Sequence, residues 1–225
     1  MRKRVSYLNE KNSNHKYIKH FNPDISVLDK ECRDLFEFNA GEGNENFNNF
    51  LMYEADRYRL DGNGVTYGVW NVSEEKDKEN SRDIVAYFTL SANAIPYIDR
   101  IMLDESEMLM SGEKFDEENC GISVLEIKMF AVYDKYQDRF YIFEEQVLPI
   151  AVWCLYAIIN YANKLLNSVL GFKALFLHSV PEAEKFYLRN GFQDMRLNMH
   201  PFACVDSEMR PMWLPLRDIH MNYEK

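Results

Sequence analysis

The sequence predicts an α/β (α+β) fold class, in which helices pack against a central sheet. Residues 174–177 are an apolar run of strand length that leads into a helical stretch, and Asn-Gly at 190–191 ends that stretch. Two earlier runs, 65–72 and 84–90, are rich in β-branched and aromatic residues and are typical of strands. Residues 147–159 are uncharged and almost all apolar, which indicates a helix covered on most sides. Strands and helices that alternate in this way predict a shared core.

A single domain is expected from 225 residues, of which 47% are hydrophobic and 14% aromatic. The first 21 residues are polar and basic and are expected to form an extension. The formal net charge of −10 makes nucleic acid an unlikely partner, because an acidic chain repels phosphate backbones.

The four cysteines are scattered and contain no C-x-x-C pair, so the sequence predicts neither a metal site nor a disulfide framework. The uncharged run 147–159 is too short to span a bilayer of about 30 Å. No apolar signal segment follows the basic residues near the start. A cytoplasmic protein without a membrane partner is therefore expected, and its oligomeric state stays open.

The elements expected in the first half are, in order, a short strand near 17–19, helices over 26–36 and 47–57, strands over 65–72 and 84–90, and a central strand over 122–132. Residues 73–83 are mostly charged and are expected to form a solvated hairpin loop. Residues 104–119 are far more acidic than basic and lack strong periodicity. They predict an acidic insertion, either a solvated loop or a segment that lies over a site.

The elements expected in the second half are a long helix over roughly 143–167, a strand over 174–177, a helix that ends at Asn190, and strands over 192–197 and 212–216. Pro149 is tolerated in the long helix only near its start or at a kink. Ser179 and Glu182 have the spacing of a capping box, with Pro181 in the first turn of the later helix.

Phe186-Tyr187, followed by Gly191-Phe192, resembles the FYxxxGF signature of the GNAT N-acetyltransferases, and the order of elements over roughly 36–216 is similar to the GNAT order. The resemblance implies a mixed central sheet of about six or seven strands flanked by helices, with a splay between the fourth and fifth strands. It also implies acetyl-CoA as the cofactor. The segment 65–90 bears a weaker resemblance to the branch that contains tRNA-acetylating toxins.

Tyr187 is the predicted general acid, because GNAT enzymes often use this tyrosine to protonate the departing thiolate of coenzyme A. A phenol with a pKa near 10 is protonated at neutral pH and can donate that proton. The alternative is a core aromatic side chain whose hydroxyl reaches water.

Glu126 is the predicted base, since residues 126–132 resemble the strand of the histone-acetyltransferase branch whose glutamate deprotonates a lysine through water. Apolar strand neighbours would raise the pKa of this carboxyl toward a useful value. The alternative is a solvent-facing residue paired with Lys128 or another neighbour. His178, just past its strand, is a further candidate base or a local hydrogen-bonding residue.

The resemblance also implies which residues hold the cofactor. Along the thioester arm these are Met129, Phe130, Ala131 and Val132, and at the pyrophosphate they are Gln137, Asp138, Arg139, Phe140, Tyr141 and Ile142. The second group departs from the family pattern, because Phe140 and Ile142 stand where glycines belong and obstruct close backbone approach to phosphate. Asp138 adds repulsion, and Arg139 offers a compensating charge.

These residues together predict an N-acetyltransferase that moves an acetyl group from acetyl-CoA to an amine acceptor by direct attack. The acceptor is expected to be a small molecule or a protein lysine, because an aminoacyl-tRNA calls for a basic face. The competing hypothesis is a non-catalytic binding or interaction module with the GNAT fold, which the altered glycine positions favour.

Overall fold

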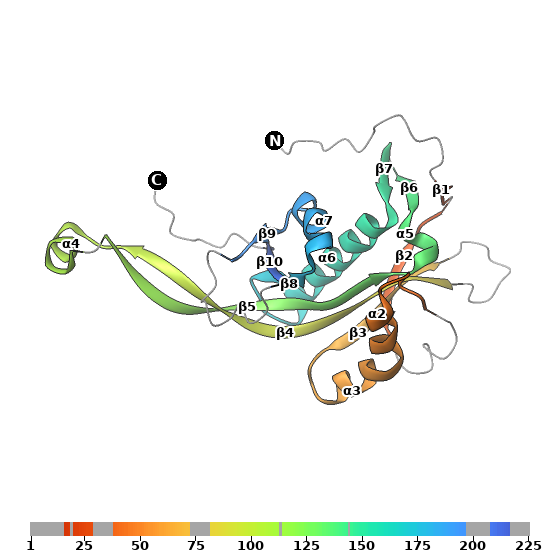
Figure 1. Cartoon of the computed structure of the whole chain (residues 1–225), viewed down its shortest axis with the longest axis horizontal. Helices are drawn as coiled ribbons and strands as arrows, with labels where there is room; N and C mark the ends of the chain where they lie inside the picture. Colours follow the sequence, from red (N-terminus) through yellow and green to blue (C-terminus); the bar gives the residue numbers. More distant parts are fainter. Residues whose placement is uncertain are drawn as a thin grey trace. The chain divides into compact units, whose positions relative to one another are not determined.

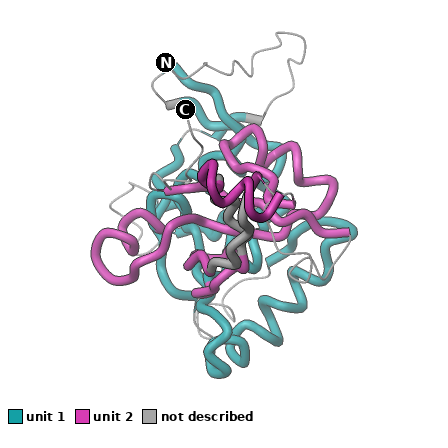
Figure 2. Tube along the Cα trace, turned by 90° about the vertical axis from the view of Figure 1, so that its left-hand side faces the viewer, with its two compact units in different colours: residues 1–90, 128–161 teal, residues 91–127, 162–225 magenta. Residues whose placement is uncertain are grey.

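The computed structural model describes residues 16–18, 20–28, 38–72, 82–112, 114–143, 145–196 and 208–216. The chain divides into two compact units, shown in different colours in Figure 2. Unit 1 contains residues 1–90 and 128–161, and unit 2 contains residues 91–127 and 162–225. Strands β4 (Arg82–Met102) and β5 (Phe115–Val132) contribute residues to both units.

Seven strands form a mixed sheet in the order β2-β3-β4-β5-β8-β10-β9 (Figure 1). Beside β4 and β5, the strands are β2 (Pro23–Val27), β3 (Val65–Val72), β8 (Ala174–Ser179), β9 (Gln193–Asp194) and β10 (Arg210–Pro215). The pairing of β5 with β8 is parallel, whereas β2–β3, β3–β4, β8–β10 and β9–β10 pair antiparallel. The predicted mixed sheet of six or seven strands is confirmed.

The core of unit 1 is a cluster of aromatic and aliphatic side chains under the helices that follow residue 44. Those helices are α2 (Glu45–Asn49), the π-helical turn η1 (Phe50–Glu54) and α3 (Ala55–Leu60). Phe50 and Leu51 are buried with Trp70 and Tyr87 of the sheet, and the Tyr87 hydroxyl donates a 2.8 Å hydrogen bond to the Phe47 carbonyl. The predicted helix over 47–57 is present within this run, and its apolar face is what unit 1 buries.

The helix predicted over 26–36 is wrong at its start. Pro23–Val27 forms strand β2, which pairs antiparallel with β3 from Pro23 opposite Asn71 to Val27 opposite Tyr67. Proline is accepted here because it stands at the first residue of a strand that has one neighbour in the sheet. Residues 29–36 of the predicted helix lie outside the described residues.

The long helix predicted from residue 143 begins later. Strands β6 (Arg139–Phe143) and β7 (Gln146–Pro149) form an antiparallel hairpin, and α6 runs over Ile150–Ser168. A second sheet results, because β1 (Lys16–Tyr17) pairs parallel with β6. Aromatic and β-branched residues favour the hairpin, and Pro149 ends it just before the helix starts.

The segment 104–119 of unit 2 is structured rather than a loop. Helix α4 (Glu105–Ser111) follows β4 and carries a capping box, since Asp104 accepts from the backbone amides of Ser106 and Glu107 while Glu107 accepts from the Asp104 amide. The Ser106 hydroxyl also donates to Asp104, and this hydrogen bond, followed by that from the Glu107 amide, lowers the pKa of Asp104. Strand β5 then starts at Phe115, so the predicted solvated insertion is a helix between two strands.

The core of unit 2 lies on the strands around β8. Its buried residues are Ile95, Ile122, Val124, Ala174, Phe176, Met195 and Trp213. Strand β10 pairs with β8 along six residues, from Arg210 opposite Ser179 to Pro215 opposite Ala174. The strands predicted over 192–197 and 212–216 correspond to β9 and β10. Within the described residues, no helix has both the length and the apolar character needed to cross a membrane, and the cytoplasmic location stays a prediction.

Candidate active site

Strands β5 and β8 pair in parallel over three residues only, and all of the paired residues belong to unit 2. Val124, Leu125 and Glu126 lie opposite Ala174, Leu175 and Phe176, and the register ends there. Strand β8 nevertheless continues to Ser179 and keeps its pairing with β10 to that end. The predicted splay between the fourth and fifth strands of the sheet is therefore confirmed. Backbone groups on the β5 side of β8 after Phe176 need other partners, and a bound ligand can supply them.

Glu126 ends this short pairing and is buried, with 2% of its surface exposed. Its Oε2 accepts a 2.6 Å hydrogen bond from Asn93 Nδ2, and its Oε1 lies 3.5 Å from His178 Nδ1. Burial excludes the solvent-facing alternative for Glu126. The two candidate bases from the sequence thus lie within ion-pair distance of one another.

Asn93 of β4 was not predicted, because single-sequence reasoning does not give the register of two distant strands. It lies in the polar Ser-Ala-Asn segment that interrupts the apolar run of β4. That interruption is the sequence signal that could have identified Asn93 as a candidate site residue.

His178 is the partly exposed member of this group, with 37% of its side chain accessible. It lies two residues past the end of the β5–β8 pairing and opposite Pro211 of β10. The Phe176 ring packs edge-on against the imidazole, with 4.9 Å between ring centroids. The buried Phe176 ring and the Glu126 carboxylate both lie against the imidazole and restrain its orientation.

Tyr187 lies in helix α7 (Glu184–Arg189) and is 9% exposed. Phe186 and Phe192 pack edge-on against its ring, with centroids at 5.1 and 5.4 Å. Gly191 has a φ of 92°, and this left-handed turn brings the Phe192 amide within 3.1 Å of the Tyr187 carbonyl. The FYxxxGF pattern is therefore a packing unit around Tyr187.

Burial raises the pKa of the Tyr187 phenol. The hydroxyl is consequently protonated at neutral pH and acts as a donor. None of the described residues hydrogen-bonds it, so the donor is available to a ligand. Both a catalytic and a purely structural role are compatible with this setting, and the general-acid role stays a prediction.

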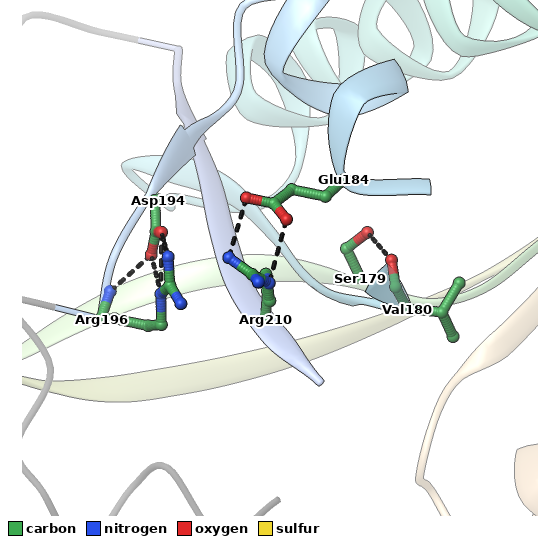
Figure 3. Close-up of polar contacts among 6 residues, drawn as sticks. All are labelled: Ser179, Val180, Glu184, Asp194, Arg196 and Arg210. Carbon is green, nitrogen blue, oxygen red and sulfur yellow. Dashed lines mark hydrogen bonds and ion pairs between the residues drawn. The ribbon is translucent and has the colours of Figure 1, made fainter. Parts of the chain in front are cut away.

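The start of α7 is fixed by an ion pair rather than by the predicted capping box (Figure 3). The Ser179 hydroxyl, at the end of buried strand β8, donates to the Val180 carbonyl at 2.9 Å and caps no helix amide. A 3₁₀ turn, η2 (Pro181–Ala183), intervenes before α7. Arg210 of β10 then donates to both carboxylate oxygens of Glu184, at 3.0 and 2.9 Å.

Glu184→Gln is expected to lower the free energy of unfolding by about 1 kcal/mol, since the two charge-assisted hydrogen bonds are partly buried. Urea denaturation measures the change. Arg57→Met serves as the control, because Arg57 and Asp61 form an exposed ion pair one helical turn apart. Equal effects of the two substitutions would show that the Glu184–Arg210 pair does not anchor α7.

The predicted thioester-arm residues, Met129 to Val132, form the last part of β5 and belong to unit 1. Ala131 and Val132 are buried, and Met129 packs against the unit 1 core. Their contact with a cofactor stays a prediction.

The predicted pyrophosphate segment does not form a loop that opens a helix. Gln137 ends the short helix α5 (Asp134–Gln137), and its Nε2 donates to the carbonyls of Ala40 and Val132 at 2.7 and 2.9 Å. Arg139 Nε donates to the Lys135 carbonyl at 2.6 Å. Residues 138–142 therefore do not form a loop at the start of a helix.

The cause is strand β6. Phe140, Tyr141 and Ile142 pair with Pro149, Leu148 and Val147 of β7, and Phe140 also pairs with β1. Backbone groups used in these ladders are not free to wrap a phosphate. Cofactor binding by Gln137, Asp138, Arg139, Phe140, Tyr141 and Ile142 remains a prediction that the structure does not favour.

Among the described residues, no cluster of three or more histidine, cysteine, aspartate or glutamate side chains could bind an ion.

Comparisons with known proteins identify solved structures with a similar fold. No family model matches the sequence, and no curated protein sequence matches it significantly. A structure of a Tyr→Phe mutant of the AtaT toxin matches with a TM-score of 0.56 and 17% identity, over 88% of this chain and 93% of AtaT. AtaT complexed with acetyl-methionyl-tRNAfMet matches with a TM-score of 0.53 and 18% identity, over 86% of this chain and 95% of that chain. The AtaT mutant bound to the C-terminus of the antitoxin AtaR and to acetyl-CoA matches with a TM-score of 0.53 and 16% identity, over 86% of this chain and 92% of that chain. At these identities the likeness shows the fold, and the GNAT-like fold predicted from the sequence is confirmed.

Proposed function

We propose that this protein is an N-acetyltransferase that moves an acetyl group from acetyl-CoA to an amine. The observation that carries the proposal is the three-residue pairing of β5 with β8. A parallel pair that parts in the middle of a sheet leaves main-chain donors without strand partners, and such donors can hold a thioester and polarise its carbonyl.

The similar structures support the choice of cofactor and reaction class. One of them is described with acetyl-CoA, and another with acetyl-methionyl-tRNAfMet, which is an acetylated amine. Each of these molecules is bound by AtaT, and their relevance to this chain rests on the shared fold.

Tyr187 is the group we assign to the leaving thiolate. Its raised pKa makes it a weaker acid than an ordinary phenol, so transfer of its proton to a thiolate is uphill in the free protein. The hydroxyl still stabilises the developing negative charge on sulfur as a hydrogen-bond donor.

A second candidate function is a binding module without turnover. The strand β6 favours it, because the backbone of residues 140–142 is engaged in pairing where phosphate binding was expected. The module and the enzyme differ in one measurable property, which is release of free coenzyme A thiol in the presence of an amine.

The acceptor amine is the second substrate of the proposed reaction. The net charge of −10 favours a small amine or a protein lysine over a nucleic acid. The complex of AtaT with acetylated tRNA makes an aminoacyl-tRNA the alternative to test beside them.

The test is thiol release from acetyl-CoA with three acceptors: glycinamide, a lysine-containing peptide and methionyl-tRNA. Mass spectrometry of each acceptor identifies an added acetyl group. Acetylation of one acceptor at a rate that depends on the protein concentration is the expected result. Thiol release that never exceeds the protein-free control with any of the three would favour the binding module.

A further inference from the structure

We propose that His178 is the base that takes the proton from the acceptor amine, and that Glu126 and Asn93 position it. This inference rests on the proposed function and assigns the base of that reaction. It replaces Glu126, the base predicted from the sequence, with the histidine beside it.

The carboxylate of Glu126 is poorly placed to meet a substrate. It is 2% exposed, and both of its oxygens face a side chain within unit 2, Oε2 toward Asn93 and Oε1 toward His178. An amine that reached this carboxylate would have to displace one of the two. Displacement would leave a buried charge with fewer hydrogen bonds, which is costly.

His178 lacks this obstacle, since 37% of its side chain is accessible. Its Nδ1 faces the carboxylate, and that arrangement favours the tautomer with the proton on Nδ1 and a lone pair on Nε2. None of the described residues hydrogen-bonds Nε2, so this nitrogen is available to an acceptor amine. The 3.5 Å separation from Glu126 is longer than an ordinary hydrogen bond, and hydrogen bonds of catalytic groups are often long in a ligand-free protein.

The position of the imidazole in the fold supports the same role. His178 follows the point where β5 and β8 part, and β10 holds this part of β8 on its other edge. The buried Phe176 ring packs against the imidazole. The short hydrogen bond from Asn93 fixes the carboxylate that faces Nδ1 of His178.

The proton balance of the reaction is complete with these groups. The acceptor ammonium loses one proton to Nε2 of His178, and this proton passes to solvent. The amine nitrogen then forms the C–N bond, and the C–S bond breaks with its electron pair on sulfur. The second nitrogen proton replaces the one that sulfur receives from Tyr187, so the products are the N-acetyl amide and the free thiol.

A double-mutant cycle tests the relation between the two residues. With acetyl-CoA and the acceptor that the wild type acetylates, His178→Ala is expected to lower kcat about 10²- to 10⁴-fold. Glu126→Gln is expected to lower kcat in the wild-type background and to have no further effect in the His178→Ala background. His20→Ala, on an exposed histidine of unit 1, is the matched control and should leave kcat unchanged.

Added imidazole should restore part of the His178→Ala activity and none in Glu126→Gln. Asn93→Ala provides a milder change on an exposed residue if Glu126→Gln does not fold, and it should lower kcat only when His178 is present. An equal loss from Glu126→Gln in both backgrounds would assign the base to the carboxylate and overturn the proposal.

A spectroscopic readout separates this proposal from the proposed function. The readout is the NMR spectrum of protein labelled with ¹⁵N-histidine, in which the His178 signals are those that disappear in His178→Gln. The neutral His178 ring should be the Nδ1–H tautomer. In Glu126→Gln, His178 should lose this preference. A wild-type protein that turns over, together with a His178→Ala protein of the same kcat, would overturn the base assignment alone. Absence of turnover in the wild type would remove the proposed function and the base assignment together, even if the tautomer is as expected.

Discussion

Tyr187→Phe is expected to lower kcat about 10²- to 10⁴-fold with little change in the KM for acetyl-CoA. The substitution removes one hydroxyl and leaves the ring between Phe186 and Phe192. None of the described residues loses a hydrogen bond to that hydroxyl, so the fold should be unaffected. Steady-state thiol release measures kcat, and urea denaturation measures stability.

The matched control for Tyr187→Phe is Tyr58→Phe. Tyr58 is a partly buried tyrosine of unit 1 that packs edge-on against Phe50. Removal of its hydroxyl tests whether loss of any ring hydroxyl affects turnover. A Tyr187→Phe protein that turns over at the wild-type rate would make Tyr187 a core residue and end its assignment as the acid.

Trp213→Ala is expected to lower the free energy of unfolding by about 3–5 kcal/mol, because it empties a large volume in a packed core. Trp213 is 3% exposed and lies in the unit 2 cluster with Phe176, opposite it on the neighbouring strand. Urea denaturation followed by circular dichroism measures the change.

Leu109→Ala is the control for Trp213→Ala, since Leu109 of α4 is 87% exposed. Its replacement should change stability by no more than about 0.5 kcal/mol. Because α7 and the end of β8 depend on this core, Trp213→Ala should also lower turnover at temperatures well below its own midpoint. A Trp213→Ala protein as stable as Leu109→Ala would contradict the described packing of unit 2.

Much of the sheet could be predicted from the sequence, because its strands have strong local signals. Val65–Val72 was predicted with the bounds that the structure has, since its β-branched and aromatic residues end at Gly64 on one side and in a charged segment on the other. The run 174–177 likewise corresponds to β8, which extends it by two residues.

The capping-box spacing alone does not predict whether the box forms, because the surroundings of the first residue decide this. Asp104 with Glu107 and Ser179 with Glu182 share the spacing of a capping box, yet the box forms only at Asp104. Asp104 is an exposed residue at a helix start, whereas Ser179 is the buried last residue of a strand. Sequence spacing does not report which of these settings applies.

The hairpin β6–β7 was missed for a related reason. A short apolar run is compatible with strand or helix, and here the run continued without a charge from β7 into α6. Pro149 was expected near the start of the helix or at a kink, and in the structure it is the last residue of β7, directly before α6.

The candidate site was partly predictable. Glu126, His178 and Tyr187 were identified from their strand and motif contexts. The partner Asn93 and the distance between Glu126 and His178 depend on tertiary pairing, which one sequence does not contain.

Calorimetric titration of the full chain with acetyl-CoA tests the central claim most directly, because the claim is that the β8 main chain beyond its pairing with β5 holds a thioester. We expect saturable binding of one acetyl-CoA per chain, with a Kd on the order of micromolar and a binding free energy of about −8 kcal/mol. Absence of binding heat up to millimolar acetyl-CoA would contradict the claim that this protein binds acetyl-CoA.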